Sequence, residues 1–173
     1  SADTSGYMNS ARLLARGEFS TPIRPVEGID AASLPGYVDE IYAPLGFRAV
    51  RHDGSLSPTY PIGLPLMIAA LATMTGWDAA PGLVVGLHAV LGVLLVYALG
   101  REFGLPPGWS AIGALALAAS PLYFHMSLWT MSDVPAMVWT TATILLAARA
   151  TRHPAWALVA GFALGLAVLI RPT

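Results

Sequence analysis

The sequence contains no cysteine and no lysine among its 173 residues, and only 11% of the residues are charged. Without cysteine, the chain forms neither disulfides nor thiolate metal sites. Soluble domains carry about a quarter charged residues, so this shortage, with a hydrophobic content of 55%, indicates a membrane protein. The net charge of −1 and the lack of a basic tract exclude nucleic acid as a partner.

The few charges are unevenly distributed along the chain. Residues 1–57 contain seven acids and five arginines, whereas residues 58–173 contain three acids and four arginines. We therefore expect two regions: an outer loop over residues 1–60 and a transmembrane helical region over residues 61–173. The expected fold class is an all-α polytopic membrane protein.

An amphipathic helix is predicted near the N-terminus, ending close to Gly17. Apolar residues recur there at i, i+4 and i+7, and polar residues recur at the same spacing on the opposite side. The apolar set is Tyr7, Ala11 and Leu14, and the polar set is Ser5, Asn9, Arg12 and Arg16. This segment is too short and too polar to cross a bilayer, so we expect it to lie along the membrane interface.

The apolar part of the chain predicts one juxtamembrane helix and about four spans. The juxtamembrane helix is expected over residues 61–76, and the spans over about 79–101, 109–129, 134–150 and 154–170. Asp78 is the expected N-cap of the first span. Pro121 predicts a kink or an unwound end in the second. Gly161 and Gly165, four residues apart in the last span, favour close helix packing.

Short loops with arginine predict the orientation in the membrane. Arg101, Arg149 and Arg152 lie in the two short loops expected on one side, and the positive-inside rule makes that side cytoplasmic. Asp3, Asp133 and Arg171 are then expected together on the outer face.

Asp133 is the only formal charge between Glu102 and Arg149, and two readings of it stand open. Ser132 or Asp133 followed by Pro135 is typical of a helix N-terminus, so capping alone would justify the residue. The other reading adds a functional role, because a serine or asparagine would cap without bringing a charge to the bilayer edge. Asp3 likewise is either a cap or a base. Arg171 either snorkels at a helix end or binds phosphate.

Histidines and aromatic residues give weaker signals. His52 and His125 could join Asp3 and Asp133 around a divalent metal ion, but no ligand pair occurs at helical spacing, so structural roles are favoured. His88 in the first span is expected to bond a neighbouring helix. The tryptophans and Tyr123 fall near predicted helix ends, as in an aromatic belt.

Several segments, taken in order, resemble the N-terminal portion of membrane glycosyltransferases of the GT-C fold. They are "ADTSGYMNSARLLARGEF", "SPTYPIGLPLMIAAL", "WDAAPGLVVGLHAVLGVLLVYALGREFG", "SPLYFHMSLWTMSDVPAMVW" and "AGFALGLAVLIRPT". The most similar branch is the bacterial one related to protein O-mannosyltransferases and the lipid A aminoarabinose transferase. That family has a span before the acidic loop and further spans after "RPT", so we expect this chain to be part of a larger transmembrane domain.

The resemblance implies an inverting glycosyltransferase in a bacterial cytoplasmic membrane, with its active site on the outer face. It would transfer a sugar from a polyprenyl-phosphate donor to a glycan, lipid or protein acceptor. The resemblance implies Asp3 as the base, Asp133 as a second acid and Arg171 at the lipid phosphate. It matches Tyr7 to the aromatic residue that follows the base, and we expect Tyr60 and His125 in the substrate site as well. No cofactor is expected, with a divalent metal ion left as an alternative.

Two other classes of function remain open from the sequence. In a transporter or flippase segment, Asp133 and His88 would lie on a substrate or proton path. Transporters bind near the midplane of the membrane, whereas the acids here fall at one face, which favours the enzyme. A non-catalytic scaffold sharing the fold is the third reading.

Overall fold

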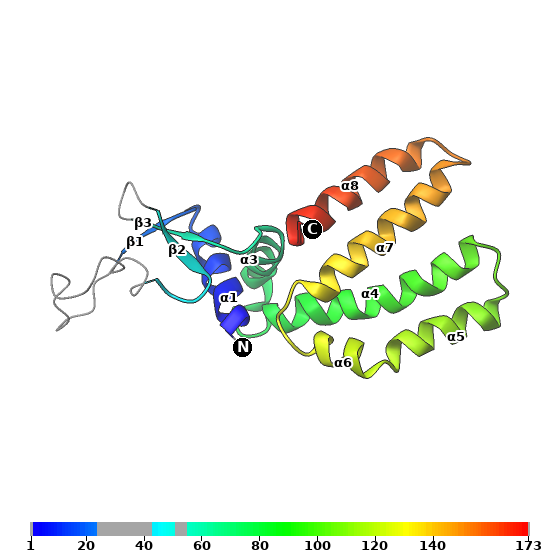
Figure 1. Ribbon diagram of the computed structural model, residues 1–173, viewed down its shortest axis with the longest axis horizontal. Helices are drawn as coiled ribbons and strands as arrows, with labels where there is room; N and C mark the ends of the chain where they lie inside the picture. Colours follow the sequence, from blue (N-terminus) through cyan, green and yellow to red (C-terminus); the bar gives the residue numbers. More distant parts are fainter. Residues whose placement is uncertain (1, 24–42, 51–54, 173) are drawn as a thin grey trace.

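Helices in an antiparallel bundle form one end of the molecule, and two crossing helices with a small sheet form the other (Figure 1). The computed structural model describes residues 2–23, 43–50 and 55–172. His52 and much of the expected loop before residue 60 lie outside the described residues.

Five helices make up the bundle: α4 (Ala80–Glu102), α5 (Pro107–Ala118), α6 (Pro121–Ser127), α7 (Asp133–Ala150) and α8 (Ala155–Ile170). The helix α7 is central, because it packs against both α8 and α4, and α5 packs on the other side of α4. Its buried residues recur every three or four positions, as one face of a helix requires. They are Val134, Val138, Ala142 and Leu145, and Pro135 in the first turn is buried beside them. Three buried alanines of α8 allow that helix to approach closely: Ala160, Ala163 and Ala167.

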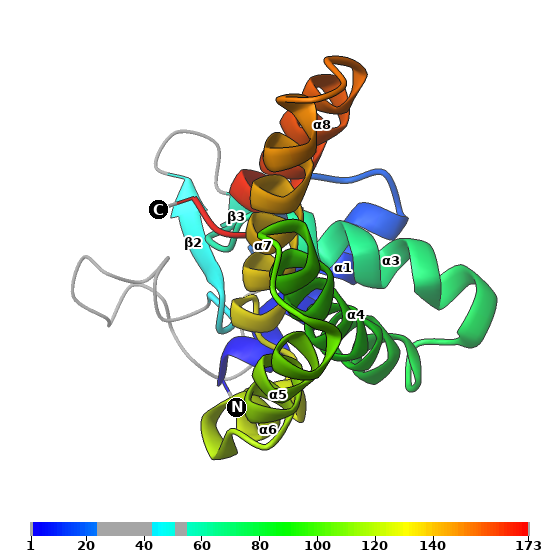
Figure 2. The same ribbon diagram turned by 90° about the vertical axis from the view of Figure 1, so that its right-hand side faces the viewer.

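The helices α1 (Ala2–Ala15) and α3 (Gly63–Thr75) cross the end of the bundle (Figure 2). Tyr7 and Ala11 of α1 are buried against Leu64 and Ile68 of α3. The helix α3 also reaches α8, where a Cβ on Gly63 would stand 2.7 Å from the carbonyl oxygen of Leu169. The backbones touch there because Gly63 has no side chain. Along the bundle axis the order is therefore sheet, α1, α3 and bundle (Figure 1).

The region before residue 61 contains a sheet, so the all-α expectation is wrong there. Strands β1 (Thr21–Pro22), β2 (Phe47–Val50) and β3 (Ser55–Pro58) pair antiparallel in the order β1-β3-β2. Arg48 pairs with Ser57 and Thr21 with Leu56, whose side chain is buried under α1. Strands of two to four residues carry too few alternating positions to give a sequence signal.

Within the predicted span over residues 109–129, α5 and α6 are separate helices, so the chain unwinds before Pro121, which is one of the two outcomes expected there. Ser120 between them has an extended backbone, with ψ of 121°, and its side chain accepts a bond from the Tyr123 amide. The following Pro121 disfavours a helical conformation at Ser120 and removes a backbone donor. The other predicted helix limits differ from the observed ones by at most two residues.

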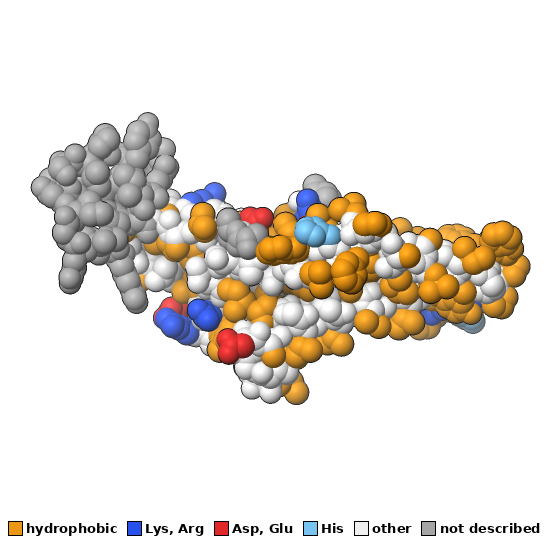
Figure 3. Space-filling model, turned by 90° about the horizontal axis from the view of Figure 1, so that it is seen from below, with side chains coloured by type: hydrophobic (Ala, Val, Ile, Leu, Met, Phe, Trp, Pro, Cys, Tyr) orange, Lys and Arg blue, Asp and Glu red, His pale blue; other side chains and the backbone are white. Residues whose placement is uncertain are grey.

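By length and composition, α4 is the one helix among the described residues that is long and apolar enough to cross a membrane. The helices α3, α5 and α8 are apolar but shorter, and α7 carries Asp133 and Arg149. Four complete spans therefore stay a prediction. Large apolar side chains cover the exposed surface of the bundle, whereas charged side chains gather toward the other end (Figure 3).

Candidate active site

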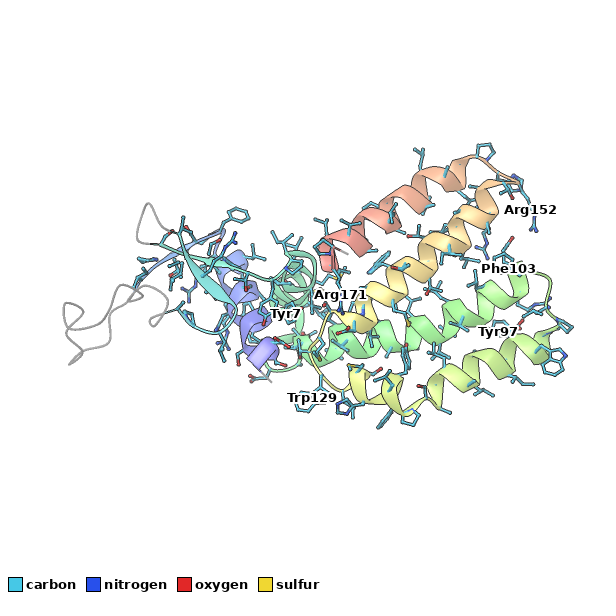
Figure 4. All side chains as sticks on the ribbon, viewed as in Figure 1. Tyr7, Tyr97, Phe103, Trp129, Arg152 and Arg171 are labelled. Carbon is cyan, nitrogen blue, oxygen red and sulfur yellow. The ribbon has the colours of Figure 1, made fainter. Side chains whose placement is uncertain are left out.

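Four segments far apart in sequence meet in an open pocket at the end of the bundle covered by α1 and α3. The pocket measures about 280 Å³. Its lining comes from the start of α1, the residues before α3, the start of α7 and the residues after α8. The lining residues are Asp3, Tyr7, Tyr60, Pro61, Met131, Ser132, Asp133, Arg171 and Pro172. Figure 4 shows Tyr7 and Arg171 beside each other at this end of the bundle.

An ion pair between Asp133 and Arg171 joins α7 to the end of α8. The guanidinium nitrogen Nη1 of Arg171 donates to Oδ1 of Asp133. Asp133 opens α7 and Arg171 follows the last residue of α8, so each charge also complements the dipole of its own helix. Both side chains stay partly exposed, at 38% for Asp133 and 50% for Arg171. The arginine is thereby held at the pocket while still reachable by a ligand.

A hydrogen bond between Tyr60 and Asp3 fixes the second carboxylate. The Tyr60 hydroxyl donates to Oδ1 of Asp3 at 2.5 Å. This bond, together with burial and the negative charge of Asp3, raises the pKa of Tyr60 to about 12. The phenol therefore stays protonated and keeps donating near neutral pH.

The ring of Tyr60 fits into a slot formed by two glycines, Gly6 and Gly46, whose backbones also contact each other. A Cβ on Gly6 would lie 2.8 Å from Cδ2 of Tyr60, and a Cβ on Gly46 would lie 2.5 Å from Cε2. Real Cβ atoms do not approach other atoms this closely, so any side chain at either position would displace the ring. Gly46 also has φ of +84°, which favours glycine. The ring of Tyr7 also packs against Tyr60, and the centroids of the two rings are 4.5 Å apart.

Tyr7 connects α1 to the start of α7. It is 5% exposed, and its hydroxyl donates to Oγ of Ser132 at 3.0 Å. Burial is the main reason that the pKa of Tyr7 is raised, and both Asp3 and Asp133 add to the rise. Tyr7 thus lies within the electrostatic reach of both carboxylates and of Arg171, which acts in the opposite direction.

Neither Asp3 nor Asp133 occupies the N-cap position of its helix. Ser132 occupies the N-cap position of α7 but makes no side-chain cap bond, and its hydroxyl accepts from Tyr7 instead. Asp133 bonds Arg171, and Asp3 lies inside the first turn of α1 and bonds Tyr60. Asp78 does not cap α4 either, because Ala79 occupies that position. Long-range partners outcompete local capping at the acids in the pocket.

The pocket contains five of the six expected site residues. His125 lies elsewhere, exposed on α6, with its ring 6.0 Å from that of Trp129. Trp129 is labelled in Figure 4 away from Tyr7 and Arg171. Within the described part of the chain, no group of three potential metal ligands is present. His88 is engaged by Val84 and by the indole of Trp139, as expected for a structural histidine.

Ser132 and the slot glycines are site residues that the sequence reading missed. Gly6 gave one usable signal, because a glycine inside a helix costs about 1 kcal/mol relative to alanine and usually has a packing reason. Ser132 gave none beyond capping.

The chemistry of the pocket follows from these pairings. Asp3 uses one oxygen for Tyr60 and retains a second one that can accept a proton, as a general base must. Arg171 retains donors beyond the one that Asp133 uses, because a guanidinium carries five N–H groups. A carboxylate with a free oxygen and a guanidinium with free donors therefore line one cavity.

The family model described as dolichyl-phosphate-mannose-protein mannosyltransferase matches residues 59–173. The match includes Tyr60, Asp133 and Arg171 and begins after Asp3 and Tyr7. Neither a curated protein nor a solved structure matches the chain significantly.

Proposed function

Since the chain belongs to the dolichyl-phosphate-mannose-protein mannosyltransferase family, which makes it a glycosyltransferase of the membrane, we propose that its pocket transfers a sugar from a polyprenyl-phosphate donor with inversion. The observation that carries this proposal is the meeting of Asp3, Asp133 and Arg171 in one cavity. The acceptor is a hydroxyl group of a glycan, lipid or protein.

Asp3 is the proposed base. Its free carboxylate oxygen takes the proton of the acceptor hydroxyl, and the acceptor oxygen attacks the anomeric carbon of the sugar. The bond between that carbon and the phosphate oxygen breaks, and the electron pair leaves with the lipid phosphate. Tyr60 holds the other carboxylate oxygen, which keeps Asp3 oriented during the proton transfer.

Arg171 is the proposed ligand of the leaving phosphate. Charge builds up on the phosphate oxygens in the transition state, and a fixed guanidinium stabilises it. Asp133 holds the arginine in place before the donor binds. We therefore propose that Asp133 acts through Arg171, by holding its guanidinium beside the leaving phosphate.

The two ends of the bundle support an active site on the outer face of the membrane. Arg149 and Arg152 lie at the end opposite the pocket and both pair with Glu102, at 3.1 and 2.9 Å. Figure 4 shows Arg152 at that far end, away from Tyr7 and Arg171. Arginines in short loops favour the cytoplasmic side, so the pocket belongs to the outer side of the bacterial cytoplasmic membrane in this proposal.

The test is sugar transfer by the full-length protein from a mannosyl polyprenyl phosphate in proteoliposomes. Asp3→Asn keeps the size of the side chain and the acceptor for Tyr60 but removes the basic carboxylate. We expect kcat to fall by about 100-fold or more, the usual contribution of a positioned base. Unchanged turnover in Asp3→Asn would contradict the assignment. No transfer by the wild type, with uptake or flipping of the lipid instead, would favour the transporter reading.

A further inference from the structure

Two exposed arginines near the C-terminal end of α1 have no role in the pocket. Arg12 and Arg16 are one helical turn apart, whereas Asp3 lies in the first turn of the same helix. Neither arginine forms an ion pair with any residue that the structure describes. The guanidinium of Arg12 instead lies 5.7 Å from the ring centroid of Trp77, within the range of cation–π contacts.

Both arginines line two neighbouring hollows. The first measures about 500 Å³ and is lined by Arg12, Ala15, Arg16 and Trp77. The second measures about 440 Å³, lies against the sheet, and adds Asn9 and the apolar side chains of Phe47 and Leu56. No carboxylate of the described residues lines either hollow, although Glu18 and Asp78 are close in sequence. The lining thus combines two cations with an aromatic ring and apolar surface.

The hollow at Trp77 lies next to the start of α4, the candidate span. Trp77 precedes the first residue of α4 by three positions, where a tryptophan sits at the headgroup level of a membrane. The crossing helix α3, which leads into Trp77, exposes Leu66 and Met74, at 52% and 83%. The helix α1 lies one layer farther from the bundle (Figure 1). Exposed apolar side chains on α3 therefore lie next to the candidate span, and α1, which carries Arg12, forms the layer beyond them.

We propose that Arg12, Arg16 and Trp77 bind the phosphate headgroup of an anionic phospholipid in the leaflet that contains the pocket. Two guanidinium groups recognise the phosphate oxygens through paired N–H donors, and the tryptophan packs at the level of the glycerol backbone. This site is separate from Arg171, which is paired with Asp133, and it does not depend on the proposed sugar transfer.

The experiment is native mass spectrometry of the full-length protein in detergent, titrated with phosphatidylglycerol or with neutral phosphatidylcholine. We expect phosphatidylglycerol to bind more tightly. Each of Arg12→Gln and Arg16→Gln should weaken its binding about fivefold, and the double variant roughly 30-fold, since one basic residue near a lipid surface contributes about a factor of five. Phosphatidylcholine binding should stay unchanged.

Arg48→Gln is the matched control, because Arg48 is an exposed arginine of β2 that lines neither hollow. An equal loss in Arg48→Gln would overturn the proposal in favour of general charge attraction. Unchanged phosphatidylglycerol binding in the double variant would also overturn it, as would displacement of the lipid by an equal concentration of inorganic phosphate. If the double variant does not fold, the wild type supplies the test. Its preference for phosphatidylglycerol over phosphatidylcholine should decrease when salt is added. A preference that salt does not reduce would contradict the site.

Discussion

The hydroxyl of Tyr60 donates to Asp3, 57 residues earlier in the chain, at 2.5 Å. The ring that carries this hydroxyl packs against Gly6 and Gly46, which contact each other, and against Tyr7. The position of one carboxylate thus depends on a phenol, and the position of the phenol depends on two residues without side chains. Each of these dependencies is open to a separate test.

Removal of the Tyr60 hydroxyl tests the first dependency. In Tyr60→Phe the ring stays in its slot, but Asp3 loses its fixed partner, so kcat should fall by about tenfold with a smaller change in KM. A bond to a charged group contributes about 1.5–3 kcal/mol, which sets this magnitude. Tyr97→Phe, a substitution on the distant part of α4, should leave sugar transfer unchanged. A rise in KM with kcat unchanged would assign Tyr60 to substrate binding instead.

Alanine at Gly6 tests the slot. Alanine normally favours a helix over glycine by about 1 kcal/mol, so Gly82→Ala in α4, where a Cβ meets no described atom within 4 Å, should be neutral or stabilising. In Gly6→Ala the new Cβ collides with Tyr60, so the thermal midpoint should fall and kcat should drop as in Tyr60→Phe. Differential scanning fluorimetry and the transfer assay measure both effects. If Gly6→Ala behaves like Gly82→Ala, the ring does not need the slot.

The raised pKa of Tyr60 predicts a pH window for stability. The folded state favours the neutral phenol, with a pKa of about 12 against 10.0 when unperturbed. The stabilisation is therefore complete below pH 10 and is lost as the pH rises from about 10 to about 12. The difference in thermal midpoint between wild type and Tyr60→Phe should be constant below pH 10 and shrink above it. A difference that persists unchanged at pH 12 would contradict the hydrogen bond.

Asp133 and Arg171 should be coupled more strongly in activity than in stability. Both side chains are partly exposed, and such pairs contribute about 0.2–1 kcal/mol to folding. Arg171→Gln should lower kcat by about 100-fold because the leaving phosphate loses its cation. Asp133→Asn should cost about tenfold in the wild-type background and little in the Arg171→Gln background. If the losses in kcat from the two substitutions are additive in the double variant, Asp133 has a role separate from Arg171. His125→Ala, outside the pocket, serves as the control.

The sequence predicts much of the helical part because apolar runs bounded by proline and glycine mark helix ends well. At Ser120 it gives two outcomes, a kink or an unwound end, and the structure has the second. It fails for Gly161 and Gly165, since a Cβ at either would meet no described atom within 4 Å, and alanines line the contact of α8 with α7 instead. Helical spacing identifies a face, but it does not say which neighbour that face meets.

For the candidate site, alternation of the helices across a membrane is enough to place Asp3, Asp133 and Arg171 at one end. That reasoning does not predict which side chain each of them bonds. Capping is a local rule and considers residues three or four positions away, whereas Asp3 bonds a residue 57 positions away and Arg171 one 38 positions away. His125 is expected at the same end of the helices as the acids, but it belongs to α6, a separate short helix, and does not line the pocket.

The hydrogen bond from Tyr7 to Ser132 spans 125 residues and has a consequence for biogenesis. Synthesis proceeds from the N-terminus, so α1 emerges long before α7 exists. The phenol of Tyr7 has no partner during that interval, and Arg171 arrives later still. The pocket is therefore completed only after α8 and Arg171 have been synthesised, and a chain stalled before that point holds Asp3 without the cation that the proposed reaction requires.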